Sequence, residues 1–400
     1  MTSTDKKIAF VSDEPVAFGM RGNPEALARL LSAYPSDKLV IFQTSGSLPP
    51  EEQRIKGVKY ILNRSCWDRL LKTRFYKIGL ILRAINYLFF YQPLLRDLRH
   101  FSIDSIVTLI HSNSWMLATG VSRKLNLPIN LIVHDGPDNF CFNLPLMAPL
   151  IRRELLRACR QAHSRWSISQ SLEQYFQIFS GIPGEVLPPL RRSSDKSPVP
   201  LSQDLLESND VVYFGALCFP STLEMLNKFS DVLKLFNGNL YVYGGISPAI
   251  SKHIEWSARR FNFMGSFSDR GHFFSICRQK YKFMYLPFSF TENAIKWSFP
   301  SKIVDYTLIG LPILLQAPSE SPIAAWCANW EGSLVHVAEN DQLMLANAVS
   351  TLLTSKELRL KIARAGIEAS EASFSFQQNT SYFYNRIRKS AKKNPQQLMN

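Results

Sequence analysis

Short apolar runs alternate with longer amphipathic segments through both halves of this sequence. In the first half, residues 8–11, 39–42, 58–62, 103–110 and 129–133 read as strands, and in the second half residues 211–214, 240–243 and 261–264 do, followed by a buried strand end at Tyr285. Strands that alternate with helices of this length are typical of parallel sheets with helices on both faces. The pattern predicts an α/β protein with two doubly wound, Rossmann-like parallel sheets.

The two halves are separated by a segment of different composition. Between Arg191 and Asp210 the apolar periodicity stops and Ser and Pro become frequent, which is typical of a linker. We therefore expect a first domain over residues 1–190, a linker over 191–208 and a second domain over 209–375. Residues 376–400 are predicted to form a C-terminal helix and a basic tail. The aromatic segment 374–384 is expected to close the second domain.

One stretch of the second half, residues 285–313, has the pattern of a ligand-binding loop. It reads as a strand end, a loop, a short helix and another strand. Ser before Pro favours the start of a helix, so we expect Ser298, Pro300 and Ser301 to open it and Gly310 to end it. Such a start leaves backbone N–H groups unsatisfied after a strand, where open α/β sheets bind anions.

Three polar residues of this stretch have helical spacing. Asp305 lies four residues after Ser301 and three after Lys302, so the three side chains can share one helical stripe. Four residues rise about 6 Å along a helix, which would set a phosphate at the start and a ribose diol beside Asp305. The alternative is a capped, solvated helix with an ordinary Lys/Asp pair, and spacing alone does not choose between them.

The balance of charged residues and the positions of the cysteines indicate which partners and which kinds of site this protein is expected to have. The 46 Lys and Arg residues outnumber the 32 Asp and Glu residues. This excess favours an anionic partner, either nucleotide phosphates, a membrane surface or nucleic acid, although it also serves solubility. The 6 cysteines are scattered without a C-x-x-C, which predicts reduced thiols and a cytoplasmic location. No apolar run reaches the roughly 18 to 20 residues of a membrane-spanning helix.

Several common chemistries have no motif in this sequence. It contains no Asp-x-Asp pair, no phosphate-binding loop of the G-x-x-x-x-G-K-[ST] type and no G-x-S-x-G turn. It also contains no recognisable nucleic-acid-binding motif. We therefore expect no metal, no cofactor and no nucleic-acid partner.

A basic and aromatic segment, residues 69–101, follows helical spacing. Its apolar positions recur every three or four residues, and Lys and Arg fill most of the others. A helix of this kind either lies in a lipid headgroup layer or packs its apolar stripe on a sheet. A helix in the headgroup layer predicts that the protein associates peripherally with the inner face of an anionic membrane.

Three segments of the chain resemble one family. PSKIVDYTLIGLPIL (300–314) is similar to the donor-binding segment of retaining nucleotide-sugar glycosyltransferases with the GT-B fold. IVTLIHSNSWMLATGVSRKLNLPINLIVHDG (106–136) resembles the end of their first domain, and VYGG (242–245) resembles a strand and glycine turn of their second. The resemblance implies two domains that face each other across a cleft. It also implies transfer of a sugar from a nucleotide diphosphate sugar to a saccharide or lipid-linked saccharide in glycan assembly, with retention and without a metal.

The resemblance assigns roles to particular residues. Ser301 and Lys302 would face the diphosphate, Asp305 the ribose, and His134, as the catalytic residue, would donate a hydrogen bond to the donor sugar. The other donor-binding residues implied are Ser298, Gly215 and Gly244. The acceptor-side residues implied are Gly19, Arg21, Gly22 and Asp135. The donor itself is a co-substrate, so no separate cofactor is expected.

Two departures from the family pattern keep an alternative open. Many members carry an acid eight residues before the ribose-binding one, where this chain has Trp297 and its nearest upstream acid is Glu292. Members also carry a basic pair after the first glycine loop, but this chain has no Lys or Arg between Gly215 and Lys228. Lys302, Arg270 and Arg21 are the candidates to replace that charge. The alternative function is a non-catalytic relative that acts as a binding or scaffolding subunit.

Overall fold

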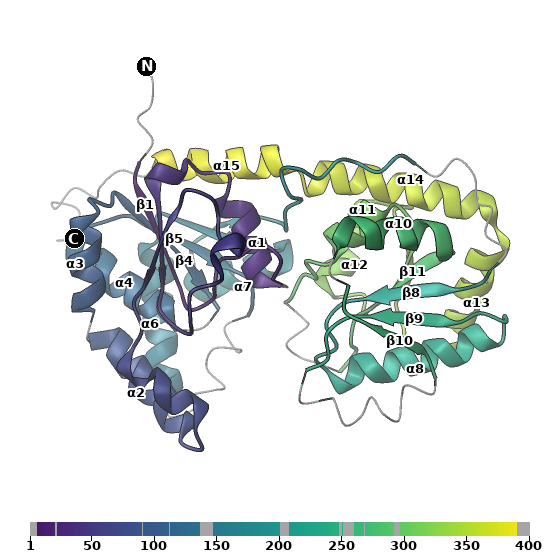
Figure 1. The fold of residues 1–400 in the computed structure, drawn as a ribbon, viewed down its shortest axis with the longest axis horizontal. Coiled ribbons are helices and arrows are strands. Elements are labelled where there is room, and N and C mark those ends of the chain that lie inside the picture. The colour runs from purple at the N-terminus through teal and green to yellow at the C-terminus, as the bar shows by residue number, and fades with distance from the viewer. Residues whose placement is uncertain are drawn as a thin grey trace. The chain divides into compact units, whose positions relative to one another are not determined.

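The computed structural model describes residues 6–20, 22–89, 91–111, 113–136, 147–200, 208–247, 250, 260–267, 269–291 and 297–389. The chain divides into two compact units. Unit 1 comprises Met1–Ser193 together with Phe376–Asn400, and unit 2 comprises Ser194–Ser375. Each unit is built on its own parallel sheet (Figure 1).

Unit 1 contains a seven-stranded parallel sheet with the strand order β3-β2-β1-β4-β5-β6-β7. The five inner strands are buried along their whole length, because helices cover both faces of the sheet. The strands are β1 (Ile8–Ser12), β2 (Leu39–Gln43), β3 (Lys59–Leu62), β4 (Ser105–Ile110), β5 (Ile129–Val133), β6 (Ser164–Ser167) and β7 (Glu185–Val186).

The helices of unit 1 alternate with these strands, as the sequence pattern predicts. They are α1 (Asn23–Leu31), α2 (Tyr76–Phe89), α3 (Gln92–His100), α4 (Ser114–Leu125), α6 (Ala148–Gln161) and α7 (Gln170–Ser180), with the short 3₁₀ helices η1 (Ser36–Lys38), η2 (Glu51–Gln53) and η3 (Cys66–Lys72). The helix α7 begins at a Ser169 side chain that accepts from the Leu172 N–H and ends at the left-handed Gly181.

The basic segment 69–101 forms three separate elements, η3, α2 and α3. Pro93 stands in the first turn of α3, the position where a helix tolerates proline, so α2 ends before it. Among the described residues, no single helix is long and apolar enough to cross a membrane. The bent pair α2 and α3 meets the length and composition criteria together. However, α3 buries Leu94, Leu95 and Leu98 within unit 1.

Unit 2 contains a six-stranded parallel sheet with the order β10-β9-β8-β11-β12-β13. Its strands are β8 (Val211–Phe214), β9 (Leu240–Tyr243), β10 (Asn262–Gly265), β11 (Phe283–Pro287), β12 (Ile313–Gln316) and β13 (Val335–Val337). Its helices are α8 (Pro220–Lys234), α10 (Arg270–Lys280), α11 (Ile303–Ile309), α12 (Pro322–Asn329), α13 (Gln342–Thr354) and α14 (Lys356–Ser373). The predicted fold class, two doubly wound parallel-sheet domains, is confirmed.

The last helix, α15 (Phe376–Lys389), belongs to unit 1 and not to the unit that precedes it in sequence. Its Phe383 and Tyr384 are buried, with the Phe383 ring 5.2 Å from that of Trp166 and the Tyr384 hydroxyl donating to the Leu30 carbonyl. The expectation that the aromatic segment 374–384 closes the second domain is therefore wrong for this helix. Its apolar face matches a surface of unit 1, which local periodicity does not reveal.

Candidate functional site

Each sheet has a topological switch point, where ligands of open α/β proteins bind at the carboxyl ends of the strands. In unit 2 the chain runs outward from β8 to β9 and β10, then returns to β11 on the other side of β8. The switch point of unit 2 therefore lies between β8 and β11. Gly215 directly follows β8, and the segment that leads to α11 follows β11.

Two predicted donor-binding glycines meet at this edge of the unit 2 sheet. A Cβ atom added to Gly244 would stand 1.9 Å from the Gly215 carbonyl oxygen, so only glycine allows this approach of the two loops. Gly215 itself adopts φ +153°, a region that residues with a side chain rarely occupy. The turns after β8 and β9 are thus in direct backbone contact, with Gly244 buried and Gly215 half-buried.

The Lys302 side chain reaches the same glycine turn. Its ammonium lies 3.3 Å from the Tyr213 hydroxyl and 4.9 Å from the centre of the Tyr213 ring. A Cβ atom at Gly215 would stand 3.1 Å from the Lys302 Nζ atom. The structure therefore places a cation beside the loop that lacks a following basic residue in sequence. Lys228, the first basic residue after that loop, pairs instead with Glu224 on α8 at 2.9 Å.

The helix that carries Lys302 begins later than the sequence predicts. Helix α11 starts at Ile303, with Lys302 as its first flanking residue and no side-chain cap, so the expected start near Ser298 is wrong. Ser301 forms a turn with its carbonyl accepting from the Val304 N–H. Pro300 supplies no N–H donor but has its carbonyl bound by the Ile303 N–H. Ser298 and Ser301 are both half-buried in this approach to α11.

Tyr306 fixes α11 against the switch point, a role that the sequence analysis does not assign. Its buried hydroxyl donates to the carbonyl of Phe214 in β8 and lies 3.0 Å from the Tyr285 carbonyl in β11. Its ring stacks on Phe214 with centroids 4.2 Å apart. Because Tyr306 is tied to both strands that flank the switch point, the neighbouring Lys302 and Asp305 have fixed positions.

Asp305 is engaged by an arginine from a different helix. Arg270, the first residue of α10, donates to Asp305 at 2.6 Å and to both oxygens of Asp195, at 2.5 and 3.2 Å. The Asp305 side chain keeps 25% of its surface exposed. Burial lowers the pKa of Arg270, but the two carboxylates outweigh this effect and raise it, so the guanidinium stays charged. The spacing of Lys302 and Asp305 would allow an ion pair between them. In the structure Asp305 pairs with Arg270 instead.

Of the residues named in the two departures from the family pattern, Trp297 is described by the structure, and Glu292 and Arg21 are not. Trp297 is half-buried at the start of the described segment that leads to α11. Glu292, the nearest upstream acid, lies outside the described residues, as does Arg21.

In unit 1 the switch point lies between β1 and β4, and Asp13 joins the two strand ends there. Asp13 follows β1, and its Oδ2 atom accepts from the backbone N–H groups of Asn113 and Ser114 at 3.0 Å each, at the start of α4. Its Oδ1 atom accepts from the Tyr87 hydroxyl at 2.9 Å and from the Thr44 hydroxyl. Asp13 thus connects the ends of β1, β2 and β4 with α2.

His111, which no sequence motif marks, also lies at the switch point of unit 1. His111, after β4, lies with Nδ1 2.5 Å from Asp135 and with Nε2 3.5 Å from Glu14. Burial favours the neutral imidazole, but the hydrogen bond and charge of Asp135 outweigh it, and the pKa of His111 is raised. Asp135, predicted on the acceptor side, is therefore part of an Asp/His pair at the switch point.

His134 lies at the carboxyl end of β5, beside this pair. Its Nδ1 atom is 2.9 Å from Oδ1 of Asn23, the first residue of α1. Because an amide oxygen only accepts, this contact favours the tautomer with the proton on Nδ1, which leaves Nε2 as an acceptor. Burial lowers the pKa of His134 to about 4, against a raising effect of Asp135, so the imidazole is neutral at pH 7.

The glycine loop between β1 and α1 is held by a buried carboxylate. Gly19 and Gly22 adopt φ +78° and +74°, the left-handed region that favours glycine. The Gly19 N–H donates to Glu25 at 2.7 Å, and Glu25 also binds Arg29 and Arg192. Both glycines therefore shape a loop whose residue 21 is outside the described chain.

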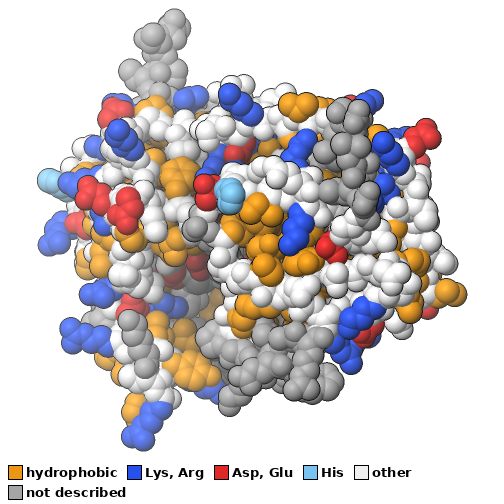
Figure 2. All heavy atoms as spheres, turned by 45° about the vertical axis from the view of Figure 1, so that its right-hand side comes forward, with side chains coloured by type: hydrophobic (Ala, Val, Ile, Leu, Met, Phe, Trp, Pro, Cys, Tyr) orange, Lys and Arg blue, Asp and Glu red, His pale blue; other side chains and the backbone are white. Residues whose placement is uncertain are grey.

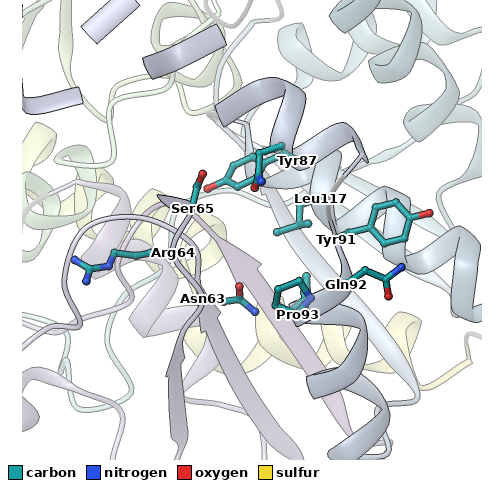
Figure 3. A pocket seen from close by; sticks show the side chains of 10 residues that line it. Asn63, Arg64, Ser65, Tyr87, Tyr91, Gln92, Pro93 and Leu117 are labelled. Atoms are coloured by element: carbon teal, nitrogen blue, oxygen red, sulfur yellow. The ribbon is translucent and has the colours of Figure 1, made fainter. Parts of the chain in front are cut away.

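A cavity of about 320 Å³ opens next to this edge of unit 1. It lies among the turn after β3, the inner face of α2, the start of α3 and Leu117 of α4 (Figure 3). Tyr87 is shared by the cavity and by Asp13, which connects the cavity with the switch point. The lining residues are Asn63, Arg64, Ser65, Asn86, Tyr87, Tyr91, Gln92, Pro93, Leu94 and Leu117.

Within the part of the chain that the structure describes, no group of three or more His, Cys, Asp or Glu side chains is placed to hold a metal ion. At the switch point of unit 1, Asp13 accepts from backbone N–H groups and hydroxyls, and Asp135 contacts His111.

Solved structures with the same architecture are nucleotide-sugar glycosyltransferases. The chain is similar to Anabaena Alr3699/HepE in complex with UDP and glucose, with 15% identity, a TM-score of 0.68 and coverage of 96% of this chain and 100% of that one. It is also similar to an E. coli trehalose-6-phosphate structure bound with UDP-2-fluoro glucose (13% identity, TM-score 0.67, coverage 96% and 99%). Sucrose-phosphate synthase from Thermosynechococcus elongatus matches with 13% identity, a TM-score of 0.66 and coverage of 96% and 98%.

No family model matches the chain, and no curated protein matches it. The likeness is therefore one of tertiary structure over nearly the whole length, and at these low sequence identities it shows the fold alone. Two doubly wound parallel-sheet units with these neighbours define that fold. The chain has the GT-B fold of nucleotide-sugar glycosyltransferases.

Proposed function

We propose that this protein is a glycosyltransferase that moves a sugar from a nucleoside diphosphate sugar to a hydroxyl group of a saccharide acceptor. The observation that carries the proposal is the position of Lys302, whose ammonium lies against the glycine turn after β8 at the switch point of unit 2. A bound nucleotide diphosphate sugar in HepE and in the E. coli neighbour is consistent with a donor of this class.

The diphosphate is the part of the donor that most requires a cation. Charge develops on the leaving phosphate as the bond to the sugar breaks, and a fixed cation stabilises that charge. Lys302 takes this role in the proposal and replaces the basic pair missing after Gly215. The backbone N–H groups at the start of α8, whose flanking Phe219 provides no side-chain cap, add a second source of positive potential.

Unit 1 provides the acceptor side of the proposal. The cavity beside α2 has a volume in the range of small-molecule sites and combines amides with tyrosine rings, groups that suit the hydroxyls and apolar faces of a sugar. The neighbouring Asp13, Glu14 and Asp135 make the switch point acidic. We propose a neutral saccharide as the acceptor, because a phosphate placed at these carboxylates would be repelled.

We propose retention of anomeric configuration without a metal. The bond from the sugar C1 to the phosphate oxygen breaks, a bond from C1 to the acceptor oxygen forms on the same face, and the acceptor proton passes to the departing phosphate oxygen. The neutral His134 would accept a hydrogen bond from a donor-sugar hydroxyl through Nε2. Asp305, held in place by Arg270, would accept from the ribose diol.

The donor is tested first, by thermal shift of the full chain with UDP, GDP and ADP. Binding to the folded state alone raises the melting temperature, so one of the three is expected to do so. The Lys302→Gln variant should weaken this binding by about tenfold to a hundredfold, the loss of one charge-assisted contact. Lys228→Gln, which removes an exposed cation from the same unit, should leave it unchanged.

Turnover is tested with the nucleotide that binds. Donor hydrolysis or transfer to a sugar panel, followed by NMR of the product anomer, reports both activity and stereochemistry, and repetition in EDTA tests the metal requirement. Binding of a nucleoside diphosphate without turnover of any donor would instead support the non-catalytic binding subunit. Absence of binding to all three nucleotides would contradict the proposal.

A further inference from the structure

The helix α2 carries apolar residues on the face that points away from its own unit. Its buried residues are Gly79, Arg83, Ala84 and Tyr87, which lie on one side of the helix. The opposite side bears Ile78, Leu82, Ile85 and Phe89, spaced four, three and four residues apart. Surface helices of soluble domains normally place polar residues there. Ile78 and Phe89, at the two ends of this stripe, are 52% and 65% exposed, and Leu82 and Ile85 between them are half-buried.

The turn from η3 into α2 extends this apolar stripe with aromatic rings. Six consecutive residues, 73–78, are exposed and include Phe75 and Tyr76 at 47% and 48%. Trp67 on η3 is 37% exposed as well. In Figure 1 this end of α2 projects from the sheet of unit 1, and the low end of that unit in Figure 2 carries hydrophobic side chains beside Lys and Arg.

Cations surround the rings, and the single acid of this region is turned inward. Arg69, Arg74 and Lys77 are exposed, and the Arg74 guanidinium lies 4.9 Å from the Phe75 ring centre. Asp68 is the one acid between residues 62 and 89. Its side chain is 12% exposed and faces the buried Arg83 at 3.9 Å. The surface formed by η3 and the outer face of α2 is therefore apolar, aromatic and positively charged, and we call it the α2 surface.

We propose that the α2 surface docks on a bilayer that contains anionic phospholipids. Aromatic rings next to cations match the headgroup region of such a membrane, and the apolar stripe matches the acyl boundary beneath it. The burial of α3 and of the inner face of α2 indicates a helix that lies on the membrane and does not cross it. The inner face of the same helix lines the cavity of unit 1, so docking would bring that cavity to the lipid surface.

The test is flotation of the full chain with vesicles of phosphatidylcholine, alone or mixed with phosphatidylglycerol. Unmodified protein should float with the anionic vesicles and not with the neutral ones, and high salt should reduce binding. The variant with Arg74→Gln and Lys77→Gln should partition roughly 25-fold less, about fivefold for each cation removed. The matched control removes two exposed cations of α14, Lys356→Gln with Lys361→Gln, and should bind as the unmodified protein does.

The apolar contribution is tested with Ile78→Ser and Phe89→Ser together. This variant should lose at least tenfold in binding at every salt concentration, because the burial of each side chain is lost. Its control, Leu343→Ser with Met344→Ser, removes an exposed apolar pair from α13 and should have no effect. Absence of flotation with anionic vesicles, or equal losses in the controls, would overturn the proposal and would favour a protein partner for the α2 surface.

The nucleotide-binding thermal shift separates this proposal from the proposed function. All four variants are expected to keep the shift, because none of the residues changed is part of the switch point of unit 2. Vesicle binding without any nucleotide binding would support the membrane surface and contradict the transferase. Nucleotide binding without vesicle binding would support the proposed function and contradict the membrane surface.

Discussion

The ammonium of Lys302 lies so close to Gly215 that a single added carbon would touch it. A Cβ atom at residue 215 would stand 3.1 Å from Lys302 Nζ and 2.9 Å from the Tyr213 hydroxyl. The backbone there also has φ +153°. These two facts join a strand end and a helix start, 87 residues apart in sequence, into one candidate phosphate site.

Substitution of Gly215 should therefore affect both the backbone and the cation. Gly215→Ala is expected to lower the free energy of unfolding by about 1–3 kcal/mol and to weaken nucleoside diphosphate binding, because the methyl group displaces Lys302. Gly332→Ala in the same unit, with φ +78° and nothing within 4 Å of its Cβ, is the control. It should show the backbone effect in denaturant unfolding and unchanged nucleotide affinity by calorimetry. Equal affinity losses in both variants would contradict the phosphate site.

The Arg270 guanidinium holds two carboxylates and should matter more to stability than either of them. Arg270→Met would remove the guanidinium that bridges Asp195 and Asp305, whereas Asp305→Asn keeps the two-oxygen contact of Arg270 with Asp195. We expect about 2–4 kcal/mol of destabilisation for the first change and about 1 kcal/mol for the second, since these groups are only partly exposed. Urea unfolding measures both, and a larger loss for Asp305→Asn would refute this arrangement.

His134 should make the folded protein less stable in acid. The unfolded chain takes up a proton at this residue near its ordinary pKa of 6.5, and the folded chain only near 4. His134 therefore causes no loss of stability above pH 6.5. As pH falls toward 4, its protonation in the unfolded chain lowers the free energy of unfolding by up to about 3 kcal/mol. His134→Gln should flatten the pH dependence of the unfolding free energy over this range. An unchanged slope in that variant would show that the imidazole is not buried in its neutral form.

His111 should behave in the opposite direction from His134. Its pKa is raised, so its stabilising pair with Asp135 is complete below its ordinary pKa of 6.5 and is lost as pH rises through the raised value. The Asp135→Asn variant lacks the carboxylate that most raises the pKa of His111, so this pKa should fall. NMR titration of the imidazole signals in the two proteins measures this. A His111 signal that titrates at the same pH in both would contradict the Asp/His pair.

The packing of α15 on unit 1 predicts where a C-terminal change acts. Phe383 is fully buried, so Phe383→Ala should remove about 3–5 kcal/mol from the stability of unit 1. Gln377→Ala on the exposed side of the helix is the matched control. At temperatures below its unfolding transition, the Phe383→Ala variant should still bind nucleotide, because α15 belongs to unit 1 and the candidate nucleotide site to unit 2. Hydrogen exchange resolves the two units, and faster exchange confined to unit 2 would be the contrary result.

Strand and helix periodicity was sufficient for the fold class, because the period of apolar residues is a local property of the chain. The start of α11 was misplaced by about one turn, because the capping preferences of Ser298 and Pro300 compete with the turn that Ser301 makes in the folded chain. The candidate residues at Gly215, Gly244, Lys302 and Asp305 came from resemblance. Their joint position at one sheet edge is a result of the structure.

Sequence by itself determined two parallel-sheet domains, and it predicted the helix that carries Asp305 but not the residue at which that helix begins. Only the tertiary structure decided that Arg270 binds Asp305, that His111 binds Asp135 and that α15 returns to unit 1. The acidic residues after β1 and the histidine after β4 were a usable signal, since both follow predicted strands. The physical reason that this signal did not suffice is strand order: carboxyl ends become neighbours only when the sheet forms, and no local pattern encodes which strands pair.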